Sequence, residues 1–244
     1  MINLIKLNYK YIFNKTTITI SLLFIMFLQF GLIYSTGIFD GYYQIDMYRV
    51  EYQLSYINDS VLLIKVVLIM MAIFIATLAN GEGSNNLAKY IVDKSIKKYS
   101  FIFARIFTLF LVMSVILILF CLSFVAISKI ITPFTIDNSY IYTIFQALLL
   151  QTFFYISFTS LLLTILPSLL TSLLPVLIFW YMEVNNTKSI IESSSIIKGI
   201  YQNIPNVVFS DNCYSLLFPI ENYIAFILIV ILLNIFIYVK KDIS

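Results

Sequence analysis

Histidine is absent from this chain of 244 residues, cysteine occurs only twice and glycine only six times. Without histidine the chain cannot form a Ser-His-Asp triad or a His-ligated zinc site, which also excludes the histidine-dependent intramembrane proteases. Cys121 lies in an apolar run and Cys213 in a polar region. The pair therefore gives no metal-binding pattern, and we do not expect a disulfide between them.

A phosphate-binding loop is also missing. The sequence contains no G-x-x-x-x-G-K-[ST] motif and no Gly-Lys dipeptide, so the chain cannot cradle nucleotide phosphates in the usual loop. Carboxylates are scarce in the apolar segments, which argues against a proton relay. We therefore expect no catalytic, metal-binding or cofactor-binding residue, and any work done by the protein must draw its energy from another chain or from an existing gradient.

Apolar side chains dominate what is present. The chain is 61% hydrophobic and only 11% charged, with a mean hydropathy of +0.98, whereas a soluble domain carries about 25% charged residues. A soluble fold of this size could not bury so many apolar side chains, so lipid must be the solvent for much of the surface. The sequence predicts one all-α membrane domain that covers residues 1–244.

Several apolar runs approach the length of about 20 residues that a membrane-crossing helix needs. We predict six spans, at residues 17–38, 60–80, 101–128, 139–165, 170–184 and 220–239. The fifth is the weakest because Pro167 and Pro175 interrupt it, but residues 166–182 contain no charge.

Two polar segments flank or separate these runs. Residues 2–15 mix apolar side chains with three lysines and are too polar to span, so we expect an amphipathic helix at the membrane surface. Residues 183–219 form the longest segment on the outer side. There we expect a surface helix, followed by a short re-entrant or interfacial piece before the last span.

Basic residues are unevenly distributed along the chain. If the N-terminus is inside, ten of the fifteen Lys and Arg residues fall on the inner side, with only three of the twelve acids. The positive-inside rule then places both termini in the cytoplasm, which requires an even number of spans. The skew toward Ile, Phe, Tyr, Asn and Lys is typical of low-GC bacterial genomes, so we expect a multi-pass protein of the bacterial plasma membrane.

Five polar side chains of interest lie within the predicted spans. Lys65 lies only about five residues, or about 7.5 Å, into the second span, so we favour an ammonium that reaches the outer headgroups over one that lines a path. Gln29, Gln146, Gln151 and Asn234 can hydrogen-bond between helices or line a path. The candidate translocation path comprises Gln29, Lys65, Gln146 and Gln151.

The longest polar and charged run, residues 80–105, lies between the second and third spans and so on the cytoplasmic side. Residues 86–98 can form an amphipathic helix, and residues 81–84 before it supply a turn and a helix N-cap. An ordinary solvated loop is the alternative. We expect the segment to contact a partner chain through Glu82, Leu87, Tyr90, Ile91, Lys94, Lys97, Lys98 and Arg105.

This layout resembles the membrane subunit of ABC-2-type transporters: an N-terminal amphipathic helix, six spans with both ends inside, and a charged helix between spans two and three. In that family the cytoplasmic segment often carries an acidic residue near Gly-Thr, then a Pro-apolar-Ser/Lys-Arg turn, then a basic residue at the foot of span three. Glu82-Gly83-Ser84, Ser95-Ile96-Lys97-Lys98 and Arg105 resemble these three parts, with Ser95 in place of the proline.

The resemblance implies a coupling helix that docks into a cytoplasmic ATPase subunit, which would hold the ATP and Mg²⁺. It also implies pairing with a second permease chain, identical or related. Size and composition resemble permeases of Gram-positive peptide exporters, including lantibiotic-immunity systems and the staphylococcal export of phenol-soluble modulins. The expected cargo is then an amphipathic or hydrophobic peptide, such as a phenol-soluble modulin or a bacteriocin-like peptide, and no nucleic acid is expected as a partner. The alternative is a non-transport membrane immunity or assembly scaffold protein.

Overall fold

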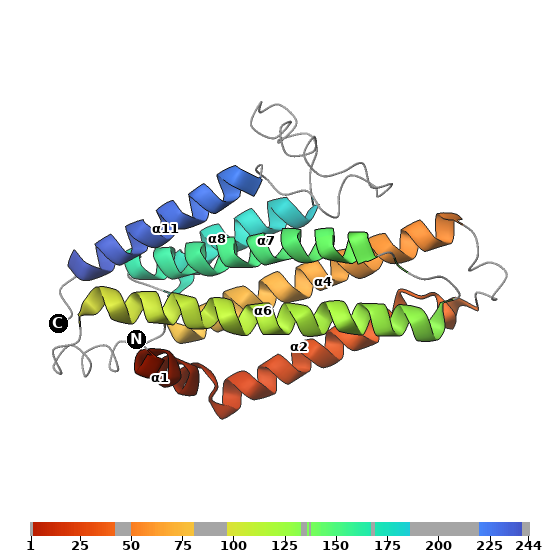
Figure 1. Ribbon diagram of the computed structural model, residues 1–244, viewed down its shortest axis with the longest axis horizontal. Helices are drawn as coiled ribbons and strands as arrows, with labels where there is room; N and C mark the ends of the chain where they lie inside the picture. Colours follow the sequence, from red (N-terminus) through yellow and green to blue (C-terminus); the bar gives the residue numbers. More distant parts are fainter. Residues whose placement is uncertain are drawn as a thin grey trace.

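The computed structural model is a bundle of helices (Figure 1). It describes residues 2–41, 50–80, 97–132, 136, 138–166, 169–185 and 220–240. Helices account for 93% of the described part, which contains no strand. The predicted all-α fold class is thus confirmed for the residues that the structure describes.

Each predicted span coincides with a helix. In chain order the elements are α1 (Ile2–Ile12), α2 (Lys15–Tyr34), the 3-10 helix η1 (Ile38–Asp40), α4 (Val50–Ala79), α6 (Lys98–Ile131), α7 (Asn138–Ile165), α8 (Leu169–Asn185) and α11 (Ile220–Lys240). Apolar runs of this length form helices in lipid because a helix satisfies its backbone hydrogen bonds within one segment.

Four stretches are long and apolar enough to cross a membrane: Lys15–Tyr34, Asp59–Ala79, Lys98–Ile131 and Ile144–Ile165. The apolar parts of α8 and α11 are shorter within the described residues, at Leu169–Tyr181 and Ile224–Lys240. Several apolar helices therefore fit a transmembrane protein, and the count of six spans stays a prediction. The predicted outer surface helix lies outside the described residues.

Two helices differ in extent from the predicted spans, and the first difference is the end of α2. This helix stops at Tyr34 rather than at residue 38. The hydroxyls of Ser35 and Thr36 donate to carbonyls of the last turn at 2.8 and 2.6 Å, which satisfies acceptors that a helix end leaves free. Gly37 then turns the chain with a φ of 67°, a conformation that glycine adopts without strain.

The second difference is the start of α4, which begins at Val50, before the predicted span at 60–80; the apolar stretch Asp59–Ala79 within it agrees with that span. Aromatic side chains hold this extension against the bundle. The hydroxyl of Tyr52 donates to the carbonyl of Thr36 at 2.6 Å, and the ring of Tyr56 lies 5.8 Å from that of Phe124 on α6. The extra turns are polar in sequence, so hydropathy alone did not include them in the predicted span.

At the centre of the bundle are α4 and α7. The first contacts α1, α2, α6, α7 and α8, and the second contacts α4, α6, α8 and α11. The chain termini lie at the same end of the bundle as the end of α4 and the start of α6 (Figure 1). The predicted partner-contacting segment therefore starts at the same end of the bundle as the termini. The side of the membrane on which that end lies stays a prediction.

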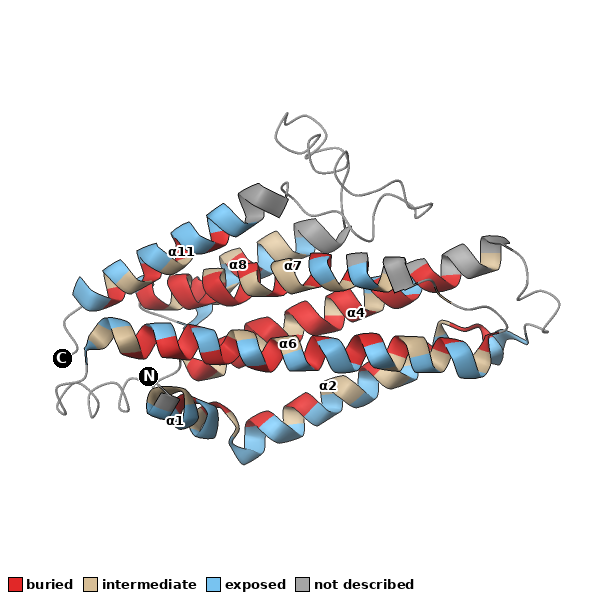
Figure 2. Ribbon diagram, in the orientation of Figure 1, coloured by how far each residue is buried: buried red, intermediate tan, exposed pale blue. Residues whose placement is uncertain are grey.

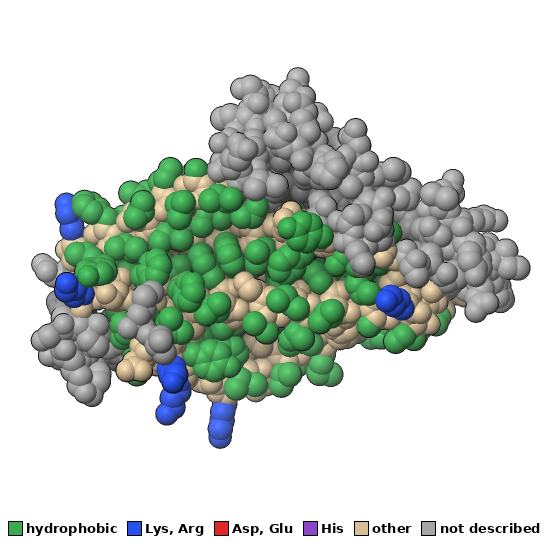
Figure 3. All heavy atoms as spheres, in the orientation of Figure 1, with side chains coloured by type: hydrophobic (Ala, Val, Ile, Leu, Met, Phe, Trp, Pro, Cys, Tyr) green, Lys and Arg blue, Asp and Glu red, His purple; other side chains and the backbone are tan. Residues whose placement is uncertain are grey.

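Burial follows the helix faces. Buried residues line the sides of the helices that face one another, and exposed residues lie on the outer sides (Figure 2). Many of the exposed residues are large and apolar. On the face shown in Figure 3 the surface is mostly apolar, and the few Lys and Arg side chains lie near its left, lower and right edges. Such an apolar surface matches the expected lipid environment.

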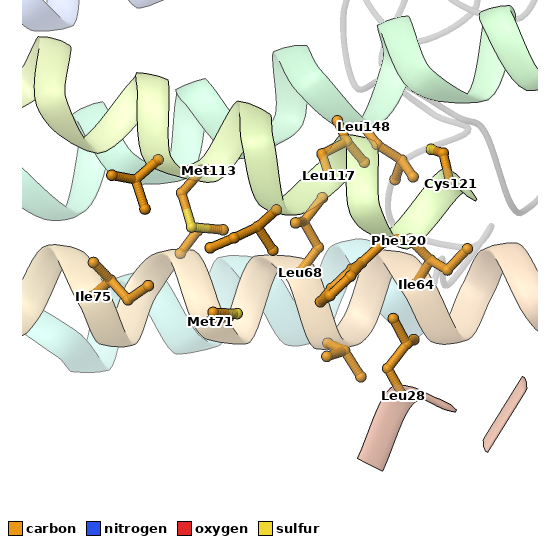
Figure 4. Close-up of a cluster of buried hydrophobic side chains, with 14 of the residues drawn as sticks. Leu28, Ile64, Leu68, Met71, Ile75, Met113, Leu117, Phe120, Cys121 and Leu148 are labelled. Atoms are coloured by element: carbon orange, nitrogen blue, oxygen red, sulfur yellow. The ribbon is translucent and has the colours of Figure 1, made fainter. Parts of the chain in front are cut away.

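The largest core cluster joins α2, α4, α6 and α7 (Figure 4). Ile64 and Leu68 of α4 contribute to it together with Leu117 and Phe120 of α6, and Leu148 adds a contribution from α7. All of these side chains except Leu148 are at most 1% exposed, and Leu148 is 2% exposed. Close packing of this kind holds membrane helices together, because lipid tails are as apolar as the side chains.

A short break separates α1 from α2. Asn14 caps α2, because its Oδ1 accepts hydrogen bonds from the backbone N–H of Thr17 at 2.8 Å and from the Thr17 hydroxyl at 3.0 Å. Helix α1 packs against α6 and α4, and its Lys6 and Lys10 are exposed. A helix is thus present where the sequence predicts an amphipathic one, and its location at the membrane surface stays a prediction.

Candidate functional site

Arg105 is buried at the end of the bundle where α4 ends and α6 begins. Its side chain is 2% exposed, and its Nη1 donates to Asn80 Oδ1 at 3.1 Å. The guanidinium lies over the ring of Phe101, 4.4 Å from the centroid. Phe101 in turn lies against Tyr238 of α11, with 6.5 Å between ring centroids. A buried cation needs such polar and aromatic partners to offset its lost hydration.

Asn80 extends these hydrogen bonds to α7 and, through it, to α11. Its Nδ2 donates to the Ala76 carbonyl at 2.7 Å and to Ser160 Oγ at 3.3 Å. One turn further along α7, the hydroxyl of Thr164 bonds to the Ser160 carbonyl at 2.8 Å and to Asn234 Oδ1 on α11 at 2.9 Å. We call this set the Arg105 network: Asn80, Arg105, Ser160, Thr164 and Asn234.

The Arg105 network links α4, α6, α7 and α11 at one end of the bundle. Among the described residues, Arg105 Nε and Nη2 and Asn234 Nδ2 have no hydrogen-bond partner. The network therefore has donor capacity left over, although buried polar groups are normally satisfied. Its hydrogen bonds join side chains from the ends of α4, α6, α7 and α11. A shift at the end of α4 or the start of α6 would reach α7 and α11 through it.

Three of the predicted partner-contacting residues are described. Lys97 is exposed and Lys98 is half-buried at the start of α6. Arg105 is 2% exposed, so its side chain is buried rather than presented beside Lys97, and its part in coupling stays a prediction. Its contribution to coupling would pass through the helices that it ties together. The others lie outside the described residues, as does the predicted amphipathic helix: Glu82, Leu87, Tyr90, Ile91 and Lys94.

The predicted path residues are not gathered on one surface of this chain. Lys65 and Gln151 are each 1% exposed, Gln29 is half-buried and Gln146 is exposed. The burial of Lys65 shows that its side chain does not reach the bundle surface, so the favoured interpretation of a snorkelling lysine is wrong. Gln146 and Gln151 lie on different faces of α7, and only Gln151 points into the bundle.

Sequence reasoning found Arg105 and Asn234 but missed Asn80, Ser160 and Thr164. Asn80 lies at the end of an apolar run. An asparagine there is as typical of an ordinary helix end as of a hydrogen bond between helices. Hydroxyl side chains are common in membrane helices and usually bond to their own helix, so nothing in the sequence distinguishes Ser160 and Thr164. The sharing of the Asn80 side chain between α6 and α7 becomes visible only when the helices are placed in space.

No family model, no curated protein and no solved structure matches this chain. The resemblance to a transporter subunit therefore rests on the sequence pattern.

A double-mutant cycle on Asn80 and Arg105 tests whether the network couples helices energetically. We expect Asn80→Ala and Arg105→Met to interact by about 0.6–1.7 kcal/mol, which lies between the average and the largest coupling measured for hydrogen bonds between membrane helices. Equilibrium unfolding of the two single variants and the double variant in mixed micelles gives this value. As a control, Asn80→Ala combined with Ser114→Ala should be additive within about 0.5 kcal/mol, because within the described part of the chain the Ser114 hydroxyl donates to the Phe110 carbonyl of its own helix. Additivity of Asn80 and Arg105 would contradict the network.

Proposed function

We propose that this chain is the membrane subunit of an ATP-driven ABC-2-type exporter in a bacterial plasma membrane, with both termini in the cytoplasm. Three features support the proposal. The described chain is a bundle of apolar helices, the sequence has no nucleotide-binding loop of its own, and its main charged segment begins at the end of the bundle that both termini share. A subunit built this way needs an ATPase from another chain.

The Arg105 network is the observation that carries the proposal. The charged segment leaves α4 at Asn80 and joins α6 at Lys97. Arg105 lies eight residues beyond Lys97, about 12 Å along the helix, and bonds back to Asn80. Both anchors of the segment therefore connect to each other and, through Ser160, to α7. Force applied to this segment by an ATPase would move the central helix α7 together with α4 and α6.

The cargo that suits this bundle is an amphipathic or hydrophobic peptide. Aromatic and aliphatic side chains cover its exposed faces, and a peptide partitioned into the membrane can approach such faces sideways. A second permease chain completes the proposed transporter. Gln146, exposed on α7, is then a candidate to line the space between the two chains, whereas Lys65 and Gln151 act from inside each bundle.

Charge reversal at the start of α6 tests the proposal. The full-length chain is purified from its native membrane with its associated ATPase and reconstituted with an amphipathic peptide. We expect Lys97→Glu with Lys98→Glu to reduce peptide-stimulated ATP hydrolysis about tenfold, which is within the usual range for coupling between sites. The matched control is Lys129→Glu, because Lys129 is exposed in the last turn of the same helix and should leave hydrolysis unchanged.

Two results would contradict the proposal. One is recovery of the chain without any ATPase, which would favour a membrane immunity or scaffold protein. The other is unchanged hydrolysis in the Lys97→Glu, Lys98→Glu variant at wild-type levels of assembly. Equal losses in this variant and in Lys129→Glu would show a general effect of added acidic charge and would also remove the support for a docking surface at the start of α6.

A further inference from the structure

An apolar groove of about 440 Å³ lies between α1, α2 and α6, with α4 beneath it. This volume falls within the range of small-molecule sites, roughly 300–1,000 Å³. None of the predicted path residues and no member of the Arg105 network lines it. The lining consists of Ile5, Tyr9 and Phe13 of α1, Ile18, Ser21, Leu22 and Ile25 of α2, Met71 of α4, and Thr108, Leu111, Val112, Val115 and Ile116 of α6.

The groove opens toward the outside of the bundle. Its rims are exposed, with Leu22 on α2 at 54% and Val115 on α6 at 57%. Its floor is buried, since Met71 is fully covered and Val112 is 6% exposed. Both α2 and α6 are long and apolar enough to cross a membrane. In a bilayer the open side of the groove would therefore face acyl chains.

Three exposed lysines lie near lining residues of the groove in the sequence. Lys6 and Lys10 of α1 directly follow the lining residues Ile5 and Tyr9, and Lys15 begins α2. All three lysines are exposed, and the sequence contains no acidic residue before Asp40 to balance them. Lysines at a membrane surface attract anionic lipid by about 1 kcal/mol each. The groove thus has an apolar lining, and the helices α1 and α2 that wall it carry exposed lysines.

Ser21 adds a polar group to the groove wall. It is 9% exposed, and its Oγ has no hydrogen-bond partner among the described residues. Serine and threonine in membrane helices usually donate to the carbonyl one turn earlier, as Thr108 in the same groove does to Ala104 at 2.6 Å. Ser21 lies six residues beyond Lys15, about 9 Å along the helix. A headgroup at Lys15 would therefore bring the ester region of a lipid close to Ser21.

We propose that this groove binds one anionic phospholipid. An acyl chain fills the apolar trough, Lys10 and Lys15 hold the phosphate, and the Ser21 hydroxyl faces the ester region. A lipid held here would fix α1 against α2 and α6 and so set the position of the N-terminal helix. The site does not depend on the transport function, because no residue that we propose for coupling takes part in it.

Lipid retention by the purified full-length chain tests the site. The chain is delipidated in mild detergent and titrated with phosphatidylglycerol or phosphatidylcholine, and bound lipid is counted by native mass spectrometry. We expect one phosphatidylglycerol per chain, bound in preference to phosphatidylcholine. Lys10→Gln with Lys15→Gln should weaken phosphatidylglycerol binding roughly 30-fold, as two lysines at about 1 kcal/mol each predict. Val115→Trp, which fills the groove from its rim, should abolish binding.

Two controls share the chemistry of these changes but lie elsewhere on α6. Lys129→Gln removes an exposed lysine at the opposite end of the bundle, and Leu122→Trp enlarges a side chain that is 60% exposed outside the groove. Both should retain the lipid. Equal binding of the two lipids would identify ordinary annular lipid and overturn the proposal. Wild-type phosphatidylglycerol binding by the lysine variant would also overturn it, and this surface variant decides the matter even if Val115→Trp does not fold.

Discussion

Replacing Leu119 with aspartate is expected to disrupt the membrane insertion of α6. Leu119 is 51% exposed and lies about 7 Å past the midpoint of this 34-residue helix, still about 18 Å from its end. A carboxylate at the centre of a membrane helix costs about 2.5–3.5 kcal/mol on insertion scales, which corresponds to a roughly 100-fold shift toward the non-inserted form. On a helix surrounded by water, the same change on an exposed face would cost about 0.5 kcal/mol or less. The inserted fraction in a microsomal translocation assay measures the difference.

The matched control for Leu119→Asp is Tyr99→Asp. Tyr99 is 49% exposed, almost as much as Leu119, but it lies in the first turn of α6. Near a helix end the carboxylate can reach the headgroups and water, so we expect the inserted fraction to stay close to that of the wild type. Equal behaviour of the two variants would mean that the middle of α6 is not surrounded by lipid, and the prediction of a span there would be wrong.

The helices could be predicted from the sequence because lipid imposes a simple rule. A long apolar run must form a helix to satisfy its backbone, so hydropathy alone located α6 and α7 to within a few residues. The rule fails where polar residues continue a helix beyond the apolar run. The start of α4 at Val50 depends on the contacts of Tyr52 and Tyr56 with other segments. Contacts of that kind produce no periodic pattern of apolar residues in the sequence.

The candidate site could be predicted only in part, and for a related reason. Arg105 attracts notice because a cation is rare in an apolar stretch. Its burial depends on what α4, α7 and α11 place around it, which the sequence does not state. Lys65 could not be placed from the sequence either. Its position along the helix suggested that its ammonium reaches the surface, but in the bundle its side chain is buried and only 1% exposed. Which face of a helix meets its neighbours is a property of the whole bundle.

Phe120 lies beside Leu119 in sequence but faces the opposite environment, and its replacement by alanine should weaken the bundle. Its side chain is 1% exposed and extends from α6 toward Ile64 and Leu68 of α4 (Figure 4). Truncation would leave a cavity on the order of 100 Å³, which at about 24 cal/mol per Å³ costs about 2–3 kcal/mol. Equilibrium unfolding in bicelles measures this loss. The value should fall below that for a soluble core, because unfolded helices remain in lipid and the water-transfer contribution is absent.

Leu119→Ala is the control for Phe120→Ala in the unfolding measurement, because it also truncates a large apolar side chain but one that faces outward. Acyl chains can fill the space that a lipid-facing side chain leaves, so we expect almost no change in the unfolding free energy. At position 120 lipid cannot enter between α6 and α4, and the lost dispersion contacts are not replaced. Similar losses at 119 and 120 would contradict the orientation of α6 in the bundle. A large loss at 120 alone would show that interlocking side chains hold these helices together, since at that depth both the folded and the separated helices are already out of water.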